Sequence, residues 1–372
     1  MTKETRSGFV FPAIRGIQAG REYYMSMCRL RLIPKIFFFD EEEANLTAEL
    51  RAQRTLNKSR VPELARYVLG NRDDYVFSAL TASIDADVTF EAIDDEGEAS
   101  NIGTLSVPFE AKFIINDGQH RRAAIEMALH EDPELAEESI AVVFFIDHGL
   151  ARCQQMFADL NRYSIRPSKS IGVLYDHRDS LARIAKLVAL KSDTFKELVE
   201  TESSSLSKRS RKLFTLSAIY NATGKLLADQ NDEDESKLAE KAIEYWNEVA
   251  KCFPEWQFVR EGKMLAGEVR SDFIHSHGTA LSALGTAGCE LLKNSKADWK
   301  KRLKLLKEID WSRSNQKLLE GRATVQGRVS KSHKNVALTT NIIKRQLDLP
   351  LSADEKRIET EFRRRQNGKK SK

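Results

Sequence analysis

The chain has 372 residues, of which 41% are hydrophobic and 31% are charged, and its formal net charge is only +4. This is the composition of a globular protein, with room for two or three domains at roughly 150 residues each. No stretch supplies the roughly 18 consecutive apolar residues that a membrane span needs, so we expect no membrane role. The polar first residues lead into no long apolar segment, which predicts a cytoplasmic protein without a secretory signal.

The cysteines and histidines give no metal-binding pattern. The four cysteines are too scattered for a zinc ribbon or a disulfide framework, so we expect free thiols at Cys28, Cys153, Cys252 and Cys289. His275 and His277 lie close together, but without nearby cysteine or carboxylate partners such a pair favours a structural role over a metal site.

The N-terminal part has the pattern of a mixed α/β domain. Alternating or β-branched apolar runs predict strands, and apolar residues at helical spacing predict helices. The predicted strands cover residues 9–18, 23–27, 29–33, 76–84, 88–93, 113–116 and 140–146, and the predicted helices cover residues 42–53, 61–69 and 119–130. The strand at 140–146 is apolar throughout and is expected inside the sheet.

From about residue 151 the pattern is helical. The predicted helices cover residues 153–161, 171–175, 180–199, 213–227, 237–252, 278–293 and 299–309. We therefore predict an α/β (α+β) domain over residues 1–150, an all-helical domain over residues 151–350, and a basic, disordered tail over residues 351–372.

The segment 113–124 carries the strongest functional signal. A short apolar strand passes through Gly118 into a helix whose first turn holds His120, Arg121 and Arg122. Because a helix N-terminus already carries partial positive charge, each such cation costs about 0.3 to 1 kcal/mol unless an anion offsets it. Backbone N–H groups and two guanidiniums at this turn therefore predict a phosphate-binding site.

The run Asp117-Gly118-Gln119-His120-Arg121 resembles the signature after which the DGQHR-domain family is named. Within that family the chain is most similar to the DndB proteins, regulators encoded beside the DNA phosphorothioation machinery. The likeness spans most of the chain and also takes in residues 16–18, 23–24, 53–54, 57, 60–61, 64–65, 157–161 and 350–352.

The DGQHR family is in turn similar to the ParB/sulfiredoxin fold, in which a strand, a glycine and an arginine at a helix start hold nucleotide phosphates. The ParB-type turn reads Gly-Glu-Arg-Arg-x-Arg-Ala; here Gly118, Arg121 and Ala124 match, whereas Gln119 takes the glutamate position. Gln119 also replaces the nucleophilic cysteine of the sulfiredoxin turn. An amide cannot act as a thiolate does, which excludes thiol-based repair chemistry.

The resemblance and the side-chain chemistry together predict a pocket that binds and hydrolyses ATP with Mg²⁺. His120 is expected to act as general acid or base, Gln119 to orient water, Arg121 to clamp phosphate, and Asp117 to serve as a base or metal ligand. Nucleotide binding is expected of Gly118 and Arg122, and the resemblance adds Asn57, Arg60 and Asn161. The alternative is that Asp117 caps the helix while the arginines hold a DNA backbone without catalysis.

Basic residues are concentrated in three places on this nearly neutral chain. Residues 312–346 hold eight Lys/Arg against one acid, the last ten residues hold six against none, and residues 208–212 hold four. Such clustering favours phosphate contacts with double-stranded DNA, although solvated surface is the alternative. The expected DNA-binding residues are Lys208, Arg209, Arg211, Lys212, Arg322, Arg328, Lys331 and Lys334, the last four in a flexible basic loop. No segment predicts a helix-turn-helix.

Taken with the resemblance, these features predict a DNA-binding repressor of the phosphorothioate-modification operon whose pocket hydrolyses ATP, with DNA nicking as an added activity. One alternative is a repressor that senses a nucleotide without turnover. Another is a protein-interaction subunit that tunes the modification enzymes by contact. A palindromic operator would favour a homodimer, yet no heptad seam is evident.

Overall fold

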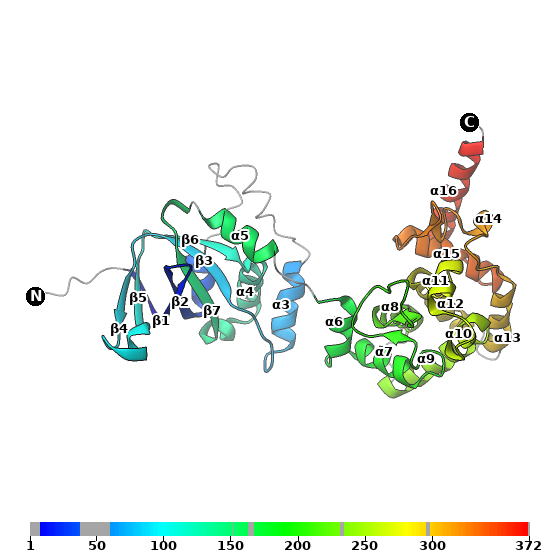
Figure 1. The fold of residues 1–372 in the computed structure, drawn as a ribbon, viewed down its shortest axis with the longest axis horizontal. Coiled ribbons are helices and arrows are strands. Elements are labelled where there is room, and N and C mark those ends of the chain that lie inside the picture. The colour runs from blue at the N-terminus through cyan, green and yellow to red at the C-terminus, as the bar shows by residue number, and fades with distance from the viewer. Residues whose placement is uncertain are drawn as a thin grey trace, which may run out of the picture. The chain divides into compact units, whose positions relative to one another are not determined.

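A computed structural model describes residues 8–37, 60–150, 152–162, 167–230, 234–294 and 298–370, and the chain divides into two compact units, Met1–Ile165 and Arg166–Lys372 (Figure 1). The mixed α/β class is as predicted. The boundary lies beyond the predicted residue 150, because helix α5 (Cys153–Arg162) packs against the sheet of the first unit. There the Cys153 thiol donates a hydrogen bond to Oδ1 of the buried Asn116, at 2.8 Å.

The first unit is built on a seven-stranded mixed sheet with the strand order β4-β5-β1-β2-β7-β3-β6. Its strands are β1 Gly8–Gln18, β2 Arg21–Arg29, β3 Leu80–Asp85, β4 Thr89–Ala92, β5 Ile102–Pro108, β6 Lys112–Asp117 and β7 Ser139–Ile146. Strand β7 lies inside the sheet, antiparallel to β2 and parallel to β3, which confirms the prediction for this apolar run.

Among the described residues of the first unit, one predicted strand is wrong and one strand was not predicted. Residues 29–33 do not continue as a strand but turn through a 3-10 helix, Leu30–Leu32, into the short helix α1, Ile33–Ile36. Pro34 stands in the first turn of α1, where its missing N–H costs nothing. Strand β5 was not predicted; it lies between the edge strand β4 and β1 and pairs with both.

Two helices of the first unit position its candidate site. Helices α3 (Arg60–Gly70) and α4 (Gln119–Glu131) pack against each other, and both confirm predicted helices. Helix α4 also buries Ile125 and Ala128 in the core, where Phe11, Phe37, Phe113 and Phe144 pack with ring centroids 5.4 to 6.4 Å apart, mostly in tilted or edge-to-face pairs. The predicted helix at 42–53 lies outside the described residues.

The second unit is mainly helical and has a core of its own, with Trp246 fully buried. Its helices are α6 Lys169–Tyr175, α7 Ser180–Lys191, α8 Leu216–Leu226, α9 Glu235–Ala250, α10 Pro254–Arg260, α11 Ala266–Asp272, α12 Gly278–Asn294, α13 Trp299–Leu303, α14 Gln316–Leu319, α15 His333–Gln346 and α16 Ala353–Lys370. Helix α12 packs against α8 and α15. The unit is not all-helical as predicted, because β8 (Val199–Glu200) pairs with β9 (Phe214–Thr215) and β10 (Thr324–Val325) pairs with β11 (Arg328–Val329).

The predicted disordered tail is wrong over residues 353–370, which form helix α16. Glu359 of this helix is buried and accepts two hydrogen bonds from Arg322, both at 2.7 Å, and one from Arg345 of α15, at 2.8 Å. Phe362 is buried beside it under the Arg322 guanidinium, 4.4 Å from the ring centroid. A carboxylate and an aromatic ring on one face therefore fix a helix that is otherwise strongly basic.

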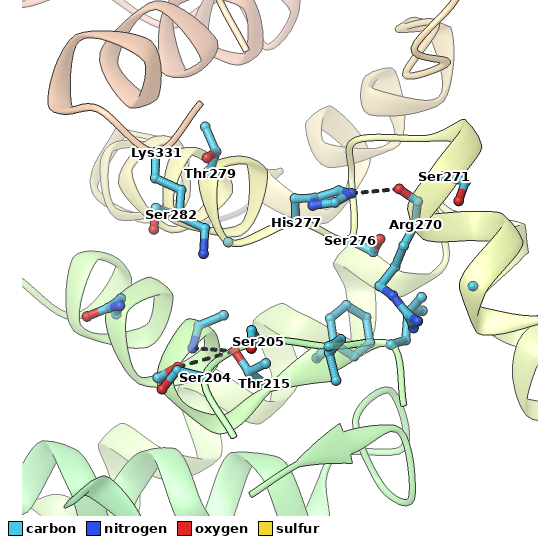
Figure 2. A pocket seen from close by; sticks show the side chains of 18 of the residues that line it. Ser204, Ser205, Thr215, Arg270, Ser271, Ser276, His277, Thr279, Ser282 and Lys331 are labelled. Atoms are coloured by element: carbon cyan, nitrogen blue, oxygen red, sulfur yellow. Dashed lines mark hydrogen bonds between the residues drawn. The ribbon is translucent and has the colours of Figure 1, made fainter. Parts of the chain in front are cut away.

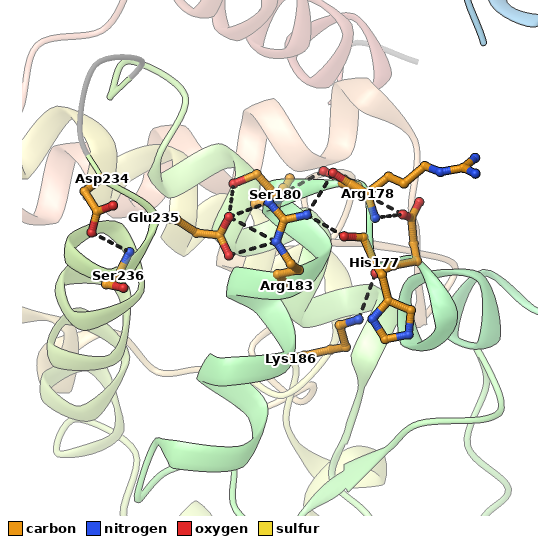
Figure 3. A network of polar contacts seen from close by, with 11 residues as sticks. His177, Arg178, Ser180, Arg183, Lys186, Asp234, Glu235 and Ser236 are labelled. Atoms are coloured by element: carbon orange, nitrogen blue, oxygen red, sulfur yellow. Dashed lines mark hydrogen bonds and ion pairs between the residues drawn. The ribbon is translucent and has the colours of Figure 1, made fainter. Parts of the chain in front are cut away.

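A polar network joins the start of α7 to the start of α9 (Figure 3). Arg183 donates to both carboxylate oxygens of Glu235, at 3.0 and 2.6 Å, and also to the His177 carbonyl at 2.5 Å. Ser180 donates to the same carboxylate at 3.0 Å. These groups are satisfied by one another, so the network is a connection between helices rather than a ligand site.

Candidate functional site

The turn between β6 and α4 requires glycine at position 118. Gly118 has φ 104°, a left-handed conformation that side chains disfavour, and a Cβ there would overlap Cδ2 of Leu80. Because glycine has no side chain to cap the helix, the first backbone N–H groups of α4 are left for solvent or a ligand. The sequence prediction of a strand–glycine–helix turn is therefore confirmed in its geometry.

Arg121 lies at this turn and is largely engaged within the protein. Its Nη2 donates to Oδ2 of Asp117 at 2.6 Å, and its Nη1 donates to the carbonyl of Ser78 at 2.8 Å and to the Ser78 hydroxyl. The Arg121 side chain is 14% exposed and that of Asp117 is 47% exposed. Asp117 thus orients Arg121, and its carboxylate still faces solvent.

Arg122 lies away from the contacts of Arg121, and its own contacts give no support to the predicted nucleotide-binding role. It is buried, and it donates to the carbonyls of Phe37 at 2.9 Å and Pro34 at 3.2 Å and to the carboxylate of Glu126. One residue along an α-helix turns the side chain by about 100°, so Arg122 points to the α1 segment while Arg121 points away from it. Arg122 therefore ties α4 to α1.

A hollow of about 340 Å³ lies beside the turn. It is lined by Arg60, Leu64 and Tyr67 of α3, by residues 76–78, and by Asp117, Gly118, His120 and Arg121. Burial lowers the pKa of His120 and the nearby Arg60 lowers it further, whereas Asp117 opposes the change. His120 is consequently neutral at pH 7, with one ring nitrogen able to donate and the other to accept.

Not every predicted residue reaches the hollow. Gln119 donates instead to the carbonyl of Ile115, at 3.4 Å, and is not among the residues that line the hollow. Asn161 belongs to α5, and its side chain, like the whole of Asn57, lies outside what the structure describes. Arg60, which was expected only from the family resemblance, does line the hollow beside His120.

The donors for a metal ion are few here. Within the described ranges, no group of three or more His, Cys, Asp or Glu side chains could hold a metal ion. Asp117 is the carboxylate that lines the hollow, and it is paired with Arg121. A Mg²⁺ ion needs only one or two carboxylates when phosphate oxygens and waters complete its octahedron, so Asp117 fits a metal that arrives with a nucleotide.

In the second unit, the basic loop at 207–212 is held in shape by a residue that the sequence did not reveal. Arg270 of α11 is buried and donates to the carbonyls of Ser207 at 2.7 Å and Ser210 at 3.2 Å, and also to that of Lys212. Gly267 allows this approach, because a Cβ there would overlap the carbonyl oxygen of Lys208. A lone arginine in an ordinary helical stretch gives no signal of this role.

The eight predicted DNA-binding residues have different environments. Lys208, Arg209, Arg211, Arg328 and Lys331 are exposed, and Lys334 is partly exposed. Lys212 donates from Nζ to the carbonyl of Glu197 at 2.9 Å. Arg322 gives both ends of its guanidinium to Glu359, so its proposed DNA contact is withdrawn. The segment expected to be a flexible loop contains the β10–β11 pair.

The cysteines are all free and buried, as predicted. His275 accepts a hydrogen bond from Trp256 at 2.9 Å and His277 lies 2.9 Å from Arg313, which agrees with structural roles. None of the helices in the described part of the chain combines the length and apolar composition that crossing a membrane requires.

These features define a protein with an α/β unit, which carries a glycine turn and a polar hollow, and a helical unit, which carries an ordered basic loop. The sequence profile of the DndB family, described as DNA-sulfur modification-associated, matches residues 11–350. Because the match covers most of its length, the chain belongs to the DndB family and is associated with DNA sulfur modification. Comparison with curated proteins and with solved structures found no significant match.

Proposed function

We propose that this DndB-family chain is a DNA-binding regulator that represses the operon for DNA phosphorothioate modification. The observation that carries the proposal is the 207–212 loop, in which Lys208, Arg209 and Arg211 are exposed while Arg270 fixes the backbone beneath them. Cations on a fixed backbone lose little conformational entropy when they meet phosphates, and such contacts set affinity and register on DNA. Family membership supplies the biological setting.

The test is a gel-shift titration of the full chain on the promoter of that operon at several salt concentrations. Replacing Lys208, Arg209 and Arg211 with Ala should weaken binding and flatten the slope of log affinity against log salt, by up to about 0.9 for each phosphate that the variant no longer neutralises. A matched control replaces Lys191, Lys225 and Lys237, which are also exposed lysines of the second unit. Equal slopes in the two triple variants would contradict the proposal. If the chain failed to bind DNA at every salt concentration tested, the remaining candidate would be a protein-interaction subunit.

In the same proposal, the hollow beside α4 binds ATP together with Mg²⁺. The support is the glycine turn, a helix start that no Gly118 side chain caps, and the convergence of Arg60, His120 and Arg121 on one hollow. The resemblance to the ParB/sulfiredoxin fold points the same way. Asp117 would hold the metal. Arg121 would contact phosphate after giving up some of its hydrogen bonds to Asp117 and Ser78.

Hydrolysis of ATP is the second candidate, and the observation that favours it is the position of His120 beside the Asp117 carboxylate in one hollow, where burial lowers the pKa of His120. A neutral imidazole can take a proton from water, whereas the imidazolium cannot. Phosphate release and nicking of supercoiled DNA should be measured for the wild type, His120→Ala and Arg121→Ala, with His130→Ala at the far end of α4 as control. Release lost only in the first two variants supports hydrolysis. Binding of ATP without release supports a sensor, and absence of ATP binding contradicts the nucleotide site.

A further inference from the structure

The second unit contains a larger hollow, of about 640 Å³, which neither the family nor the sequence assigns to a function (Figure 2). Small-molecule sites typically measure about 300 to 1,000 Å³, so this hollow is of nucleotide size. Its walls come from residues 204–208, the start of α8, helix α11, residues 276–282, Arg313 and Lys331. No aspartate or glutamate is among the described residues that line it, whereas Lys208, Arg270, Arg313 and Lys331 are.

Separate contacts fix the two backbone segments that carry Lys208 and Lys331. Arg270 fixes the backbone that carries Lys208, as described above. On the other wall, Thr279 donates to the carbonyl of Ser330 at 2.7 Å, which ties the Lys331 segment to the start of α12. Figure 2 shows Lys331 and Thr279 facing Ser204 and Ser205 across the hollow. The charged side chains therefore stand on a formed framework.

The floor of the hollow carries a polar atom that the protein does not satisfy. Ser276 is 4% exposed, and its Oγ has no hydrogen-bond partner among the described residues. The buried Nε of Arg313 likewise has none there. A buried polar group left unpaired costs about 1 to 3 kcal/mol, which an oxygen atom of a ligand would recover.

Helix α12 begins at this floor. It runs for 17 residues from Gly278, and its first backbone N–H groups have no acceptor within the helix. Burial, together with the charges of Arg313 and Arg270, lowers the pKa of His277, the preceding residue, to about 4. The positive potential at the helix start therefore comes from its own N–H groups and from these arginines, not from an imidazolium. Helix start, hydroxyls and flanking lysines are together the donor set that phosphate oxygens select.

We propose that this hollow binds a free phosphorylated ligand of nucleotide size, with a phosphate group between Lys208, Lys331 and the start of α12. The depth of Ser276 argues for a free ligand, because the phosphates of a duplex lie on a convex backbone and reach only a rim. The inference goes beyond the proposed function and does not depend on it.

The experiment is titration calorimetry of the full chain with inorganic pyrophosphate and with adenosine 5′-monophosphate. The double variant Lys208→Ala/Lys331→Ala should lose about tenfold in affinity for both probes, as expected for charge-assisted hydrogen bonds. The control Lys225→Ala/Lys237→Ala removes the same charge from exposed positions of the unit that do not line the hollow. Equal affinities in the two double variants, or no binding to the wild type, overturn the inference.

Two further variants separate this site from the others. Arg121→Ala alters the hollow of the first unit only; if it abolishes all pyrophosphate binding, the phosphate binds there and the present inference fails while the proposed function gains support. Ser276→Ala removes the unsatisfied hydroxyl and should weaken pyrophosphate binding while leaving promoter binding unchanged. If Ser276→Ala instead weakened promoter binding and left pyrophosphate binding unchanged, the floor would contact DNA, and the assignment to a free ligand would be overturned.

Discussion

Gly118 is the residue on which the candidate site of the first unit depends most directly. Its positive φ lets β6 pass into α4 within one residue, and its missing side chain makes room for Leu80. Both requirements act at once, because a side chain at this position would be strained by the backbone and also by its neighbour. The direction in which His120 and Arg121 project is set by this turn.

We predict that Gly118→Ala destabilises the first unit by more than about 2 kcal/mol, about 1 to 2 kcal/mol for the left-handed backbone and the rest for overlap with Leu80. Urea unfolding followed by circular dichroism measures the change. Gly97→Ala is the matched control, since Gly97 has φ 67° but open space around it. This variant should lose only the stability that the left-handed backbone costs. Equal losses in the two variants would show that packing against Leu80 does not matter.

Sequence reasoning found part of the candidate site at this scale. Asp117, His120 and Arg121 were predicted from one contiguous run, because a local turn can be recognised locally. Arg122 was grouped with them but is buried against the α1 segment, since charge alone does not tell which face of a helix a side chain occupies. Arg270 and Ser276 were missed because only the fold brings them to their hollow, and no pattern in the sequence marks them.

Helix α16 shows why composition can mislead at the level of an element. Its basic residues predicted disorder, yet Glu359 and Phe362 lie three residues apart on one face and are both buried. Glu359 accepts hydrogen bonds from Arg322 and Arg345, so its carboxylate pairs with two cations that would otherwise repel each other. The positions of Glu359 and Phe362 on one face thus decide that the segment is an ordered helix, despite its average charge.

The docking of α16 should therefore depend on pH. Burial raises the pKa of Glu359, but the hydrogen bonds from Arg322 and Asn341 and the charges of Arg322 and Arg345 outweigh it and lower the pKa to about 2. A carboxylate with a depressed pKa stabilises the fold above its ordinary pKa of about 4.5, and this contribution is lost as the pH falls towards about 2. We predict that Glu359→Gln costs about 3 kcal/mol at pH 7 and removes this part of the pH dependence.

Chemical unfolding of the wild type and Glu359→Gln between pH 2 and pH 7 tests this expectation. The control is Glu361→Gln, two residues along the same helix, where the side chain is exposed. A control variant that lost as much stability as Glu359→Gln would remove the special role of the buried carboxylate.

At the scale of the whole molecule, the two units have separate hydrophobic cores, one around Phe144 and one around Trp246. The division into an α/β part and a helical part was predictable, because strand-like and helix-like periodicities fall in different halves of the chain. The exact boundary was not, because α5 has helical periodicity but packs on the sheet of the first unit. Strand order was also beyond prediction, since pairing joins segments distant in sequence.

Separate cores predict two unfolding transitions in scanning calorimetry of the full chain. Gly118→Ala should lower the midpoint of one transition, and Trp246→Phe, which leaves a gap in the other core, should lower only the second. A single transition that both variants shift equally would show that the units unfold as one.

The manner in which Arg270 holds the 207–212 loop has a consequence for how this surface can change. All the acceptors are main-chain carbonyls, so these bonds from Arg270 do not depend on the side chains at positions 209 and 211. Exchanging Arg209 or Arg211 for another residue would change the charge of the surface and leave the hydrogen bonds from Arg270 in place. The charge of this loop can thus be varied while its support stays the same.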